Sequence, residues 1–310
     1  MTSARTGRWV PPWSLAVVAM CSVQLGSALS LHLIATIGPA GTAWVRLSFG
    51  GVIFLIVARP PLRSIRRRDL PVLVALGANT GIQTIAFLAA IARIPLGTCV
   101  AIEFLGPMTV AALQAHTRRA IAWPAIAAIG VALLTHPRNG RIHAAGIAFA
   151  AVAAAGWAGY ILFTHAVGDR YPGITGLALT IPIAALTVAA IGVPQAAGHL
   201  TGPMLAAGLG LALLIPVIPY SLEMLAIRRM TPTAFGTLMA LEPAIAVLLG
   251  LIILHQTPST VQAAGTVLVV LAAAAARRTS PDRSAGSGAP VQQVPAAPAH
   301  NHPTATRSAP

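Results

Sequence analysis

The segment ARIPLGTCVAIEFLGP at residues 92–107 recurs 136 residues later as RRMTPTAFGTLMALEP at residues 228–243. In this register Pro107 falls on Pro243. Each copy lies in a long apolar run, and runs of this kind follow one another along most of the chain. The repeat therefore predicts a protein of two related halves, each built from helices that cross a membrane.

The composition excludes a water-soluble globular domain. Hydrophobic residues make up 56% of the 310 residues and charged residues only 8%, whereas soluble domains carry about a quarter charged residues. So few charges cannot cover a globular surface, and we expect the chain to lie in a lipid bilayer. Nucleic-acid binding is not expected despite the net charge of +14, because the arginines are spread between apolar runs.

Apolar runs of the size needed to cross the hydrocarbon core, about 20 residues as a helix, occur ten times. Gly, Pro and Arg residues separate the runs, and the shortest separator is Arg93-Ile94-Pro95. We therefore predict an all-α membrane protein with ten transmembrane helices at 13–34, 41–58, 70–91, 96–115, 121–137, 143–166, 173–193, 203–226, 233–254 and 259–276.

The arginines lie almost entirely on one side of this predicted membrane. With the N-terminus inside, the opposite side receives only Arg93, Arg138 and Arg141. Because Lys and Arg are enriched in cytoplasmic loops, we predict that both termini are cytoplasmic. The cytoplasmic set is Arg5, Arg8, Arg59, Arg63, Arg66, Arg67, Arg68, Arg118, Arg119, Arg170, Arg228, Arg229, Arg277 and Arg278.

Five spans per half is an odd number, so the second half enters the membrane from the opposite side. Inverted repeats of this kind are typical of secondary transporters, whose binding sites lie near the midplane between the halves. We predict a cytoplasmic N-terminus at 1–12, a first repeat at 13–137, a second repeat at 138–278 and a disordered cytoplasmic tail at 279–310. The tail is rich in Pro, Ala, Ser and Gly and lacks the residues to form a core.

Three of the six acidic residues lie within predicted spans: Glu103, Glu223 and Glu242. A charge inside the bilayer is costly, so these residues are the first candidates for a functional role. Glu103 lies four residues before Pro107 and Glu242 immediately before Pro243, and a proline opens a helix by removing a backbone donor. A carboxyl group beside such a break could bind a substrate amino group or a proton.

The alternative is that these carboxyl groups only hold helices together, either protonated or paired with Arg46 or His32. Arg46 is the only arginine well inside a predicted helix, and its guanidinium group could bind a substrate carboxylate, extend to the membrane surface or neutralise a glutamate. The other polar and aromatic groups within spans could line a site or simply join helices. They are Gln24, Asn79, Gln83, Trp157, Tyr160 and Tyr220.

The motifs of several other function classes are missing. No Walker phosphate loop is present, so we do not expect ATP-driven pumping by this chain. No HExxH motif, no Cys/His metal spacing and no nucleophile with a base at workable spacing are present either. We therefore predict no metal site, no cofactor and no enzyme activity.

The stretches IPLGTCVAIEFLGPMTVAAL at 94–113 and PYSLEMLAIRRMTPTAFGTLMALEPAIA at 219–246 resemble the EamA family of the drug/metabolite transporter superfamily. Within that family they are most similar to the threonine/homoserine exporter branch, as are SVQLGSAL at 22–29 and GWAGYILFTHAVG at 156–168. The resemblance implies ten helices in two inverted repeats and efflux of small metabolites driven by the proton gradient. It also places Glu103, Glu223 and Glu242 on glutamates of the family's motifs.

Our leading hypothesis is a proton-coupled exporter of small amino acids or amines that works by alternating access in a bacterial plasma membrane. The substrate would offer its ammonium group to Glu103 or Glu242 and its carboxylate to Arg46 or a helix N-terminus. Its partners would be the small-molecule substrate and the lipid bilayer, with a homodimer as a further option. One alternative is export of a drug-like or purine-type compound, and another is a membrane receptor or scaffold that transports nothing.

Overall fold

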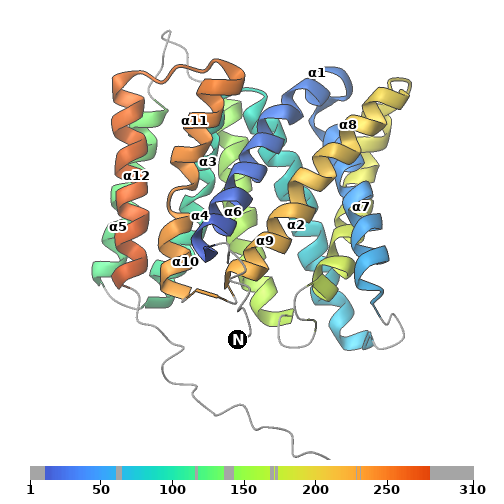
Figure 1. The fold of residues 1–310 in the computed structure, drawn as a ribbon, viewed down its shortest axis with the longest axis horizontal. Helices are drawn as coiled ribbons and strands as arrows, with labels where there is room; N and C mark the ends of the chain where they lie inside the picture. The colour runs from blue at the N-terminus through green and yellow to red at the C-terminus, as the bar shows by residue number, and fades with distance from the viewer. Residues whose placement is uncertain are drawn as a thin grey trace, which may run out of the picture. The chain divides into compact units, whose positions relative to one another are not determined.

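The computed structural model describes residues 11–60, 65–115, 118–135, 143–167, 171, 174–227, 229–230 and 232–279. Within these ranges the chain forms helices and short connections and no β-strand (Figure 1). The helices belong to one compact unit, residues 1–280. The predicted tail beyond residue 279 lies outside the described residues, as do Arg5, Arg8, Arg63, Arg138, Arg141, Arg170 and Arg228.

The helices follow the predicted spans closely. Seven helical stretches of the described chain are long and apolar enough to cross a membrane, and two shorter apolar helices, Ile121–Leu134 and Thr260–Ala276, accompany them. The prediction of an all-α membrane protein is therefore confirmed. The elements are α1 (Pro12–Ala58), η2 (Arg67–Asp69), α2 (Leu70–Ile91), α3 (Leu96–Glu103), α4 (Leu105–Ala115), α5 (Arg118–Leu134), α6 (Ala144–Val167), α7 (Ile174–Ala196), α8 (Gly202–Ala212), η3 (Leu213–Val217), α9 (Ile218–Ile227), α10 (Pro232–Met239), α11 (Glu242–Leu254) and α12 (Thr260–Thr279).

Helix α1 has 47 residues and breaks near its middle. A straight helix of this length would extend about 70 Å, more than twice the hydrocarbon core of about 30 Å. Gly38 interrupts it with φ 69° and ψ 171°, and Pro39 follows. Only glycine adopts this conformation readily, and a Cβ atom here would overlap the side chain of Gln195. The break falls where the sequence predicted a boundary, and it divides α1 into a first arm (12–37) and a second arm (39–58).

Two predicted spans are interrupted at matching points of the repeat. Helix α3 ends at Glu103, and α4 begins after the single residue Phe104. In the second half α10 ends at Met239 and α11 begins at Glu242. Pro107 and Pro243 lie in the first turn of the following helix, where the missing N–H group has no helical partner to lose.

The predicted span 203–226 is not one continuous helix. The π-helical turn η3 separates α8 from α9, and Ile215 within it has an extended backbone, with φ −149° and ψ 112°. Pro216 and Pro219 cannot donate backbone hydrogen bonds, which accounts for the irregular turn. The hydroxyl group of Ser22 in α1 donates to the Leu214 carbonyl oxygen at 2.9 Å and holds this turn against the first arm.

The helices pack in pairs that join the two predicted repeats: α1 on α7, α2 on α6, α3 on α11 and α5 on α12. Small residues permit close approach. A Cβ atom on Gly77 would lie 2.9 Å from the Thr180 carbonyl oxygen, and one on Gly81 would lie 2.9 Å from that of Ala184. The GxxxG stretch of α2 is therefore a packing surface for α7.

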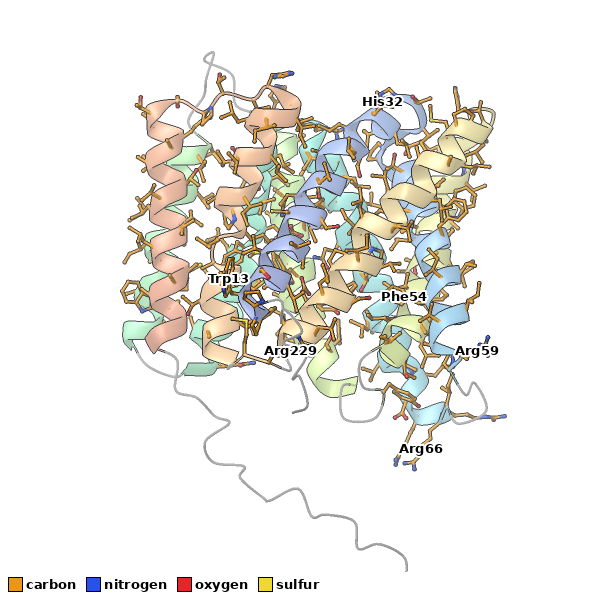
Figure 2. All side chains as sticks on the ribbon, viewed as in Figure 1. Trp13, His32, Phe54, Arg59, Arg66 and Arg229 are labelled. Carbon is orange, nitrogen blue, oxygen red and sulfur yellow. The ribbon has the colours of Figure 1, made fainter. Side chains whose placement is uncertain are left out.

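The two ends of the helical unit differ in charge. Arg59, Arg66 and Arg229 lie at one end, and His32 lies at the other (Figure 2). His32 is exposed, and no carboxylate oxygen of a described residue lies within 4 Å of its ring nitrogens, so it does not pair with Glu103 or Glu242.

Candidate functional site

A cavity of about 260 Å³ lies among α1, α2, α3, α6, η3, α9, α10 and α11. It gathers side chains from both halves of the chain. Nine of the ten polar and aromatic candidates line it: Gln24, Arg46, Gln83, Glu103, Trp157, Tyr160, Tyr220, Glu223 and Glu242. Asn79, the tenth candidate, does not line this cavity.

The break in α1 is what lets one helix contribute to the cavity twice. Gln24 and Arg46 are 22 residues apart, which on a straight helix would separate them by about 33 Å. Both nevertheless line the same small cavity. The second arm must therefore turn back from the break toward the end of the unit where the first arm begins, as Figure 1 shows.

Glu103, the last residue of α3, is buried and interacts with the preceding helix. The side-chain amide of Gln83 in α2 donates from Nε2 to Glu103 Oε1 at 3.1 Å. Since α3 ends at Glu103, the carboxyl group sits at the helix interruption and faces the cavity.

Glu242, the first residue of α11, has a similar partner from a distant part of the chain. Gln24 in the first arm of α1 donates from Nε2 to Glu242 Oε1 at 3.2 Å, across 218 residues of sequence. The second carboxyl oxygen, Glu242 Oε2, is buried and has no hydrogen-bond partner in the described part of the chain, and the same holds for Gln24 Oε1. The pair therefore holds two buried acceptors without donors.

Arg46 is buried, with 5% of its surface exposed, and it faces the cavity from the second arm of α1. Its Nε and one terminal nitrogen have no hydrogen-bond partner among the described residues. No carboxylate oxygen of a described residue lies within 4 Å of its guanidinium nitrogens. Arg46 thus neither extends to the surface nor neutralises a glutamate directly, and its donors are available to a ligand.

Aromatic residues form one wall of the cavity. The ring of Trp157 in α6 packs edge-on against Phe104, with ring centroids 5.8 Å apart. Tyr160 lies one helical turn further along α6 and interacts with Tyr220 of α9. Glu223 lies three residues beyond Tyr220 and completes a set of three carboxyl groups facing one guanidinium group.

Asn79 joins two helices. Its side-chain amide donates to the Gly156 carbonyl oxygen in α6 at 2.7 Å, and a Cβ atom on Gly159 would lie only 2.7 Å from its Oδ1. Close packing of α2 on α6 therefore places the half-buried Asn79 between the two helices, which corresponds to the interhelical alternative weighed for it from the sequence.

Nine residues that line the cavity were not predicted from the sequence. In α2 the missed residues share a face with Gln83, since Thr80, Gln83, Thr84 and Phe87 have the i, i+3, i+4, i+7 spacing of one helix face. That spacing could have revealed them. The residues of the irregular turn η3 have no such spacing that would have indicated them. The missed set is Val23, Ser27, Thr80, Thr84, Phe87, Ile215, Pro216, Pro219 and Met239.

No group of three or more His, Cys, Asp or Glu side chains that could hold a metal ion occurs among the described residues. The cavity instead offers acceptors on Glu103, Glu223 and Glu242 and donors on Arg46. This donor and acceptor set suits a ligand with an ammonium group and a carboxylate group.

Comparisons with known proteins agree on one family. Residues 144–277 match the EamA-like transporter family. The threonine/homoserine exporter RhtA of Salmonella typhimurium (strain LT2) is 34% identical over 268 residues, covering 85% of this chain and 90% of the exporter. RhtA of Escherichia coli (strain K12) is 33% identical over 258 residues, covering 82% and 86%. A solved crystal structure matches with a TM-score of 0.53 and 19% identity, covering 86% of this chain and 97% of the other, and shows a shared fold alone.

Proposed function

Because the chain belongs to the EamA-like transporter family, we propose that it is a proton-coupled exporter of small amino acids or related amines in a bacterial plasma membrane. The resemblance noted in the sequence is confirmed by this membership. The threonine/homoserine exporters at 33–34% identity cover most of the chain and support this substrate class.

The observation that carries the proposal is the unpaired guanidinium group of Arg46 in a cavity that also holds three carboxyl groups. A buried guanidinium group without a partner is costly, and a carboxylate is its preferred planar partner. A substrate carboxylate would bind Arg46, while the substrate ammonium group would bind Glu103 or Glu242. One substrate molecule would then pair with the positively charged Arg46 and with a negatively charged glutamate.

The size of the cavity favours small metabolites over drug-like compounds. Pockets for drug-sized ligands measure roughly 300–1,000 Å³, and this cavity measures about 260 Å³. The aromatic wall formed by Trp157 and Tyr160 could also accommodate a flat ring, so a purine belongs among the compounds to test.

The arrangement of the helices supports transport by alternating access. We propose ten spans in two inverted repeats, counting each arm of α1 as one span and counting α3–α4, α8–η3–α9 and α10–α11 as one span each. The recurrence of a helix interruption after 136 residues supports this count, as does the pairing of helices from the two halves. The arginines at one end of the unit support cytoplasmic termini (Figure 2).

Counterflow in proteoliposomes tests the function directly. Vesicles preloaded with unlabelled threonine, homoserine or a purine are diluted into the same labelled compound at equal pH on both sides. We expect uptake with threonine or homoserine, above that of vesicles without protein. Uptake with the purine alone would favour the alternative substrate class. The absence of uptake with every compound, in correctly reconstituted protein, would favour a receptor or scaffold.

A further inference from the structure

We propose that Glu242 and Gln24 form the proton-binding pair of this transporter, and that Glu103 is the carboxyl group that contacts the substrate ammonium. The inference rests on the proposed export function. It assigns the two roles that this function requires, proton binding and binding of the substrate ammonium group, to different glutamates. In this division Glu242 binds a proton and Gln24 is its positioning residue. When the proton is bound to Glu242, it stabilises the contact between the first arm of α1 and the start of α11.

The hydrogen bonds of the pair indicate a missing proton. An ionised carboxyl group has only acceptors, and the amide of Gln24 uses Nε2 as donor to Glu242 Oε1. Glu242 Oε2 and Gln24 Oε1 are then two buried oxygens without a donor in the described chain. Buried polar atoms of native proteins nearly always have partners. One proton on Glu242 removes the buried charge and provides the pair with the donor that it lacks.

Among the described residues, no cation lies within 4 Å of the Glu242 carboxylate oxygens to replace this proton. Its acidic neighbours are Glu103 of α3 and Glu223 of α9, and Tyr220 and Tyr160 are the other titratable groups on the cavity wall. Arg46, on the second arm of α1, has no carboxylate oxygen of a described residue within 4 Å. The described side chains of α10 and α12 that pack nearby include no titratable group. An ionised Glu242 would therefore be a buried anion facing further acidic groups.

The position of the pair links this proton to the conformation. Gln24 belongs to the first predicted repeat and Glu242 to the second, so their contact joins the two halves. Loss of the proton would leave a buried anion at this contact, which favours a conformation in which water reaches it. The N-terminus of α11, where Glu242 lies, then stabilises the negative charge. Proton binding and release would in this way favour different states of the transporter.

Glu103 differs from Glu242 in the position of its amide partner and in the hydrogen bonding of its carboxyl oxygens. Its partner Gln83 lies 20 residues away in the same predicted repeat, so their bond does not join the halves. Neither oxygen of Glu103 is among the described buried atoms that lack a partner, although the carboxyl group lines the cavity. The arrangement leaves Glu103 suited to a ligand within the cavity.

Two transport assays on the reconstituted full chain separate these roles. Counterflow at equal pH requires substrate binding and exchange, whereas accumulation driven by a pH gradient also requires proton transfer. We expect Glu242→Gln to reduce gradient-driven accumulation of threonine far more than counterflow, and Glu103→Gln to reduce both alike. Equal losses in the two assays for Glu242→Gln, or gradient-driven accumulation at the wild-type level by this variant, would overturn the assignment.

The amide partners provide a matched pair of variants. Gln24→Met keeps the length of the side chain but removes the amide, and we expect it to shift the pH dependence of flux. Gln83→Met should raise the KM for substrate without moving the pH profile. A Gln24→Met profile that coincides with wild type would contradict the positioning role.

Infrared difference spectroscopy tests the pair without transport, so it distinguishes failure of this inference from failure of the proposed function. A change of pH should produce a protonated-carboxyl band in wild-type protein that is missing in Glu242→Gln and displaced in Gln24→Met. If the same band persists in Glu242→Gln, the proton lies elsewhere and the inference is wrong, whatever substrate the protein carries.

Discussion

Gln195, near the end of α7, accepts a hydrogen bond on Oε1 from the backbone N–H group of Ala40 at 2.7 Å, at the start of the second arm of α1. The N–H group of Gly41 reaches the same oxygen at 3.0 Å. The first N–H groups of a helix have no partner within it. One glutamine from the second predicted repeat therefore caps the arm that carries Arg46 and fixes its starting point.

Removing this cap should destabilise the protein. We expect Gln195→Leu to lower the free energy of unfolding by about 1 kcal/mol, the usual cost of losing a helix cap. Thermal unfolding in detergent measures the effect. Thr187→Val on the same helix is the control, because the exposed Thr187 hydroxyl bonds only to its own helix. Equal melting temperatures for the two variants would contradict a capping role.

The break at Gly38 should tolerate no side chain. Gly38→Ala would place a Cβ atom where φ is 69° and where Gln195 already lies, and a backbone strain of this kind costs roughly 1–3 kcal/mol. We expect a lower melting temperature and less folded protein in size-exclusion chromatography. Gly202→Ala is the matched control, because a Cβ atom there meets nothing within 4 Å.

Arg46 should discriminate substrates by their carboxylate group. Arg46→Lys keeps the positive charge but loses the paired donors, and a hydrogen bond to a charged group is worth about 1.5–3 kcal/mol. We expect the KM for an amino acid to rise roughly tenfold to a hundredfold. Flux of the corresponding amine without its carboxylate should change little. Equal losses for both compounds would show that Arg46 maintains the cavity and does not bind substrate.

Asn79 should matter for stability and not for selectivity. Asn79→Leu removes the bond to the Gly156 carbonyl oxygen, which keeps its donor within helix α6, and we expect a loss of about 0.5–1.5 kcal/mol, the net contribution of one hydrogen bond. The ratio of threonine to homoserine uptake should remain that of the wild type. A changed ratio at unchanged stability would place Asn79 in the substrate site after all.

The proposed topology predicts which surface each end faces. In a variant without native cysteines, Arg59→Cys should react with a membrane-impermeant maleimide only from the cytoplasmic side. His32→Cys should react only from the opposite side, since both positions are exposed and lie at opposite ends (Figure 2). Labelling of both from one side would contradict the count of two spans within α1.

The sequence was informative where a single residue type has a strong local effect. Apolar length, the Gly and Pro residues between apolar runs and the rarity of acidic groups in the spans led to the helices, to the boundary between the two arms of α1 and to Glu103 and Glu242. The sequence was uninformative where tertiary contacts determine the role of a side chain or the shape of a turn. Asn79 and Gln83 are similar amides on the same helix, and α6 approaches both closely, at Gly159 and Gly156. Only their partners separate them, because Asn79 donates to the Gly156 carbonyl oxygen and Gln83 donates to Glu103. The turn η3 likewise depends on contacts with α1 that hydropathy does not reveal.

The acidic groups at the two helix interruptions occupy different positions, which bears on the direction of transport. In the 136-residue register Glu103 corresponds to Met239, and Glu242 corresponds to Gly106. A Cβ atom on Gly106 would overlap the Ala154 carbonyl oxygen, so no carboxyl side chain can occupy that position. The duplicated breaks thus carry their acidic groups at different positions. The two halves of the protein therefore present different side chains to the two membrane faces. We expect substrate binding and substrate release to depend differently on pH.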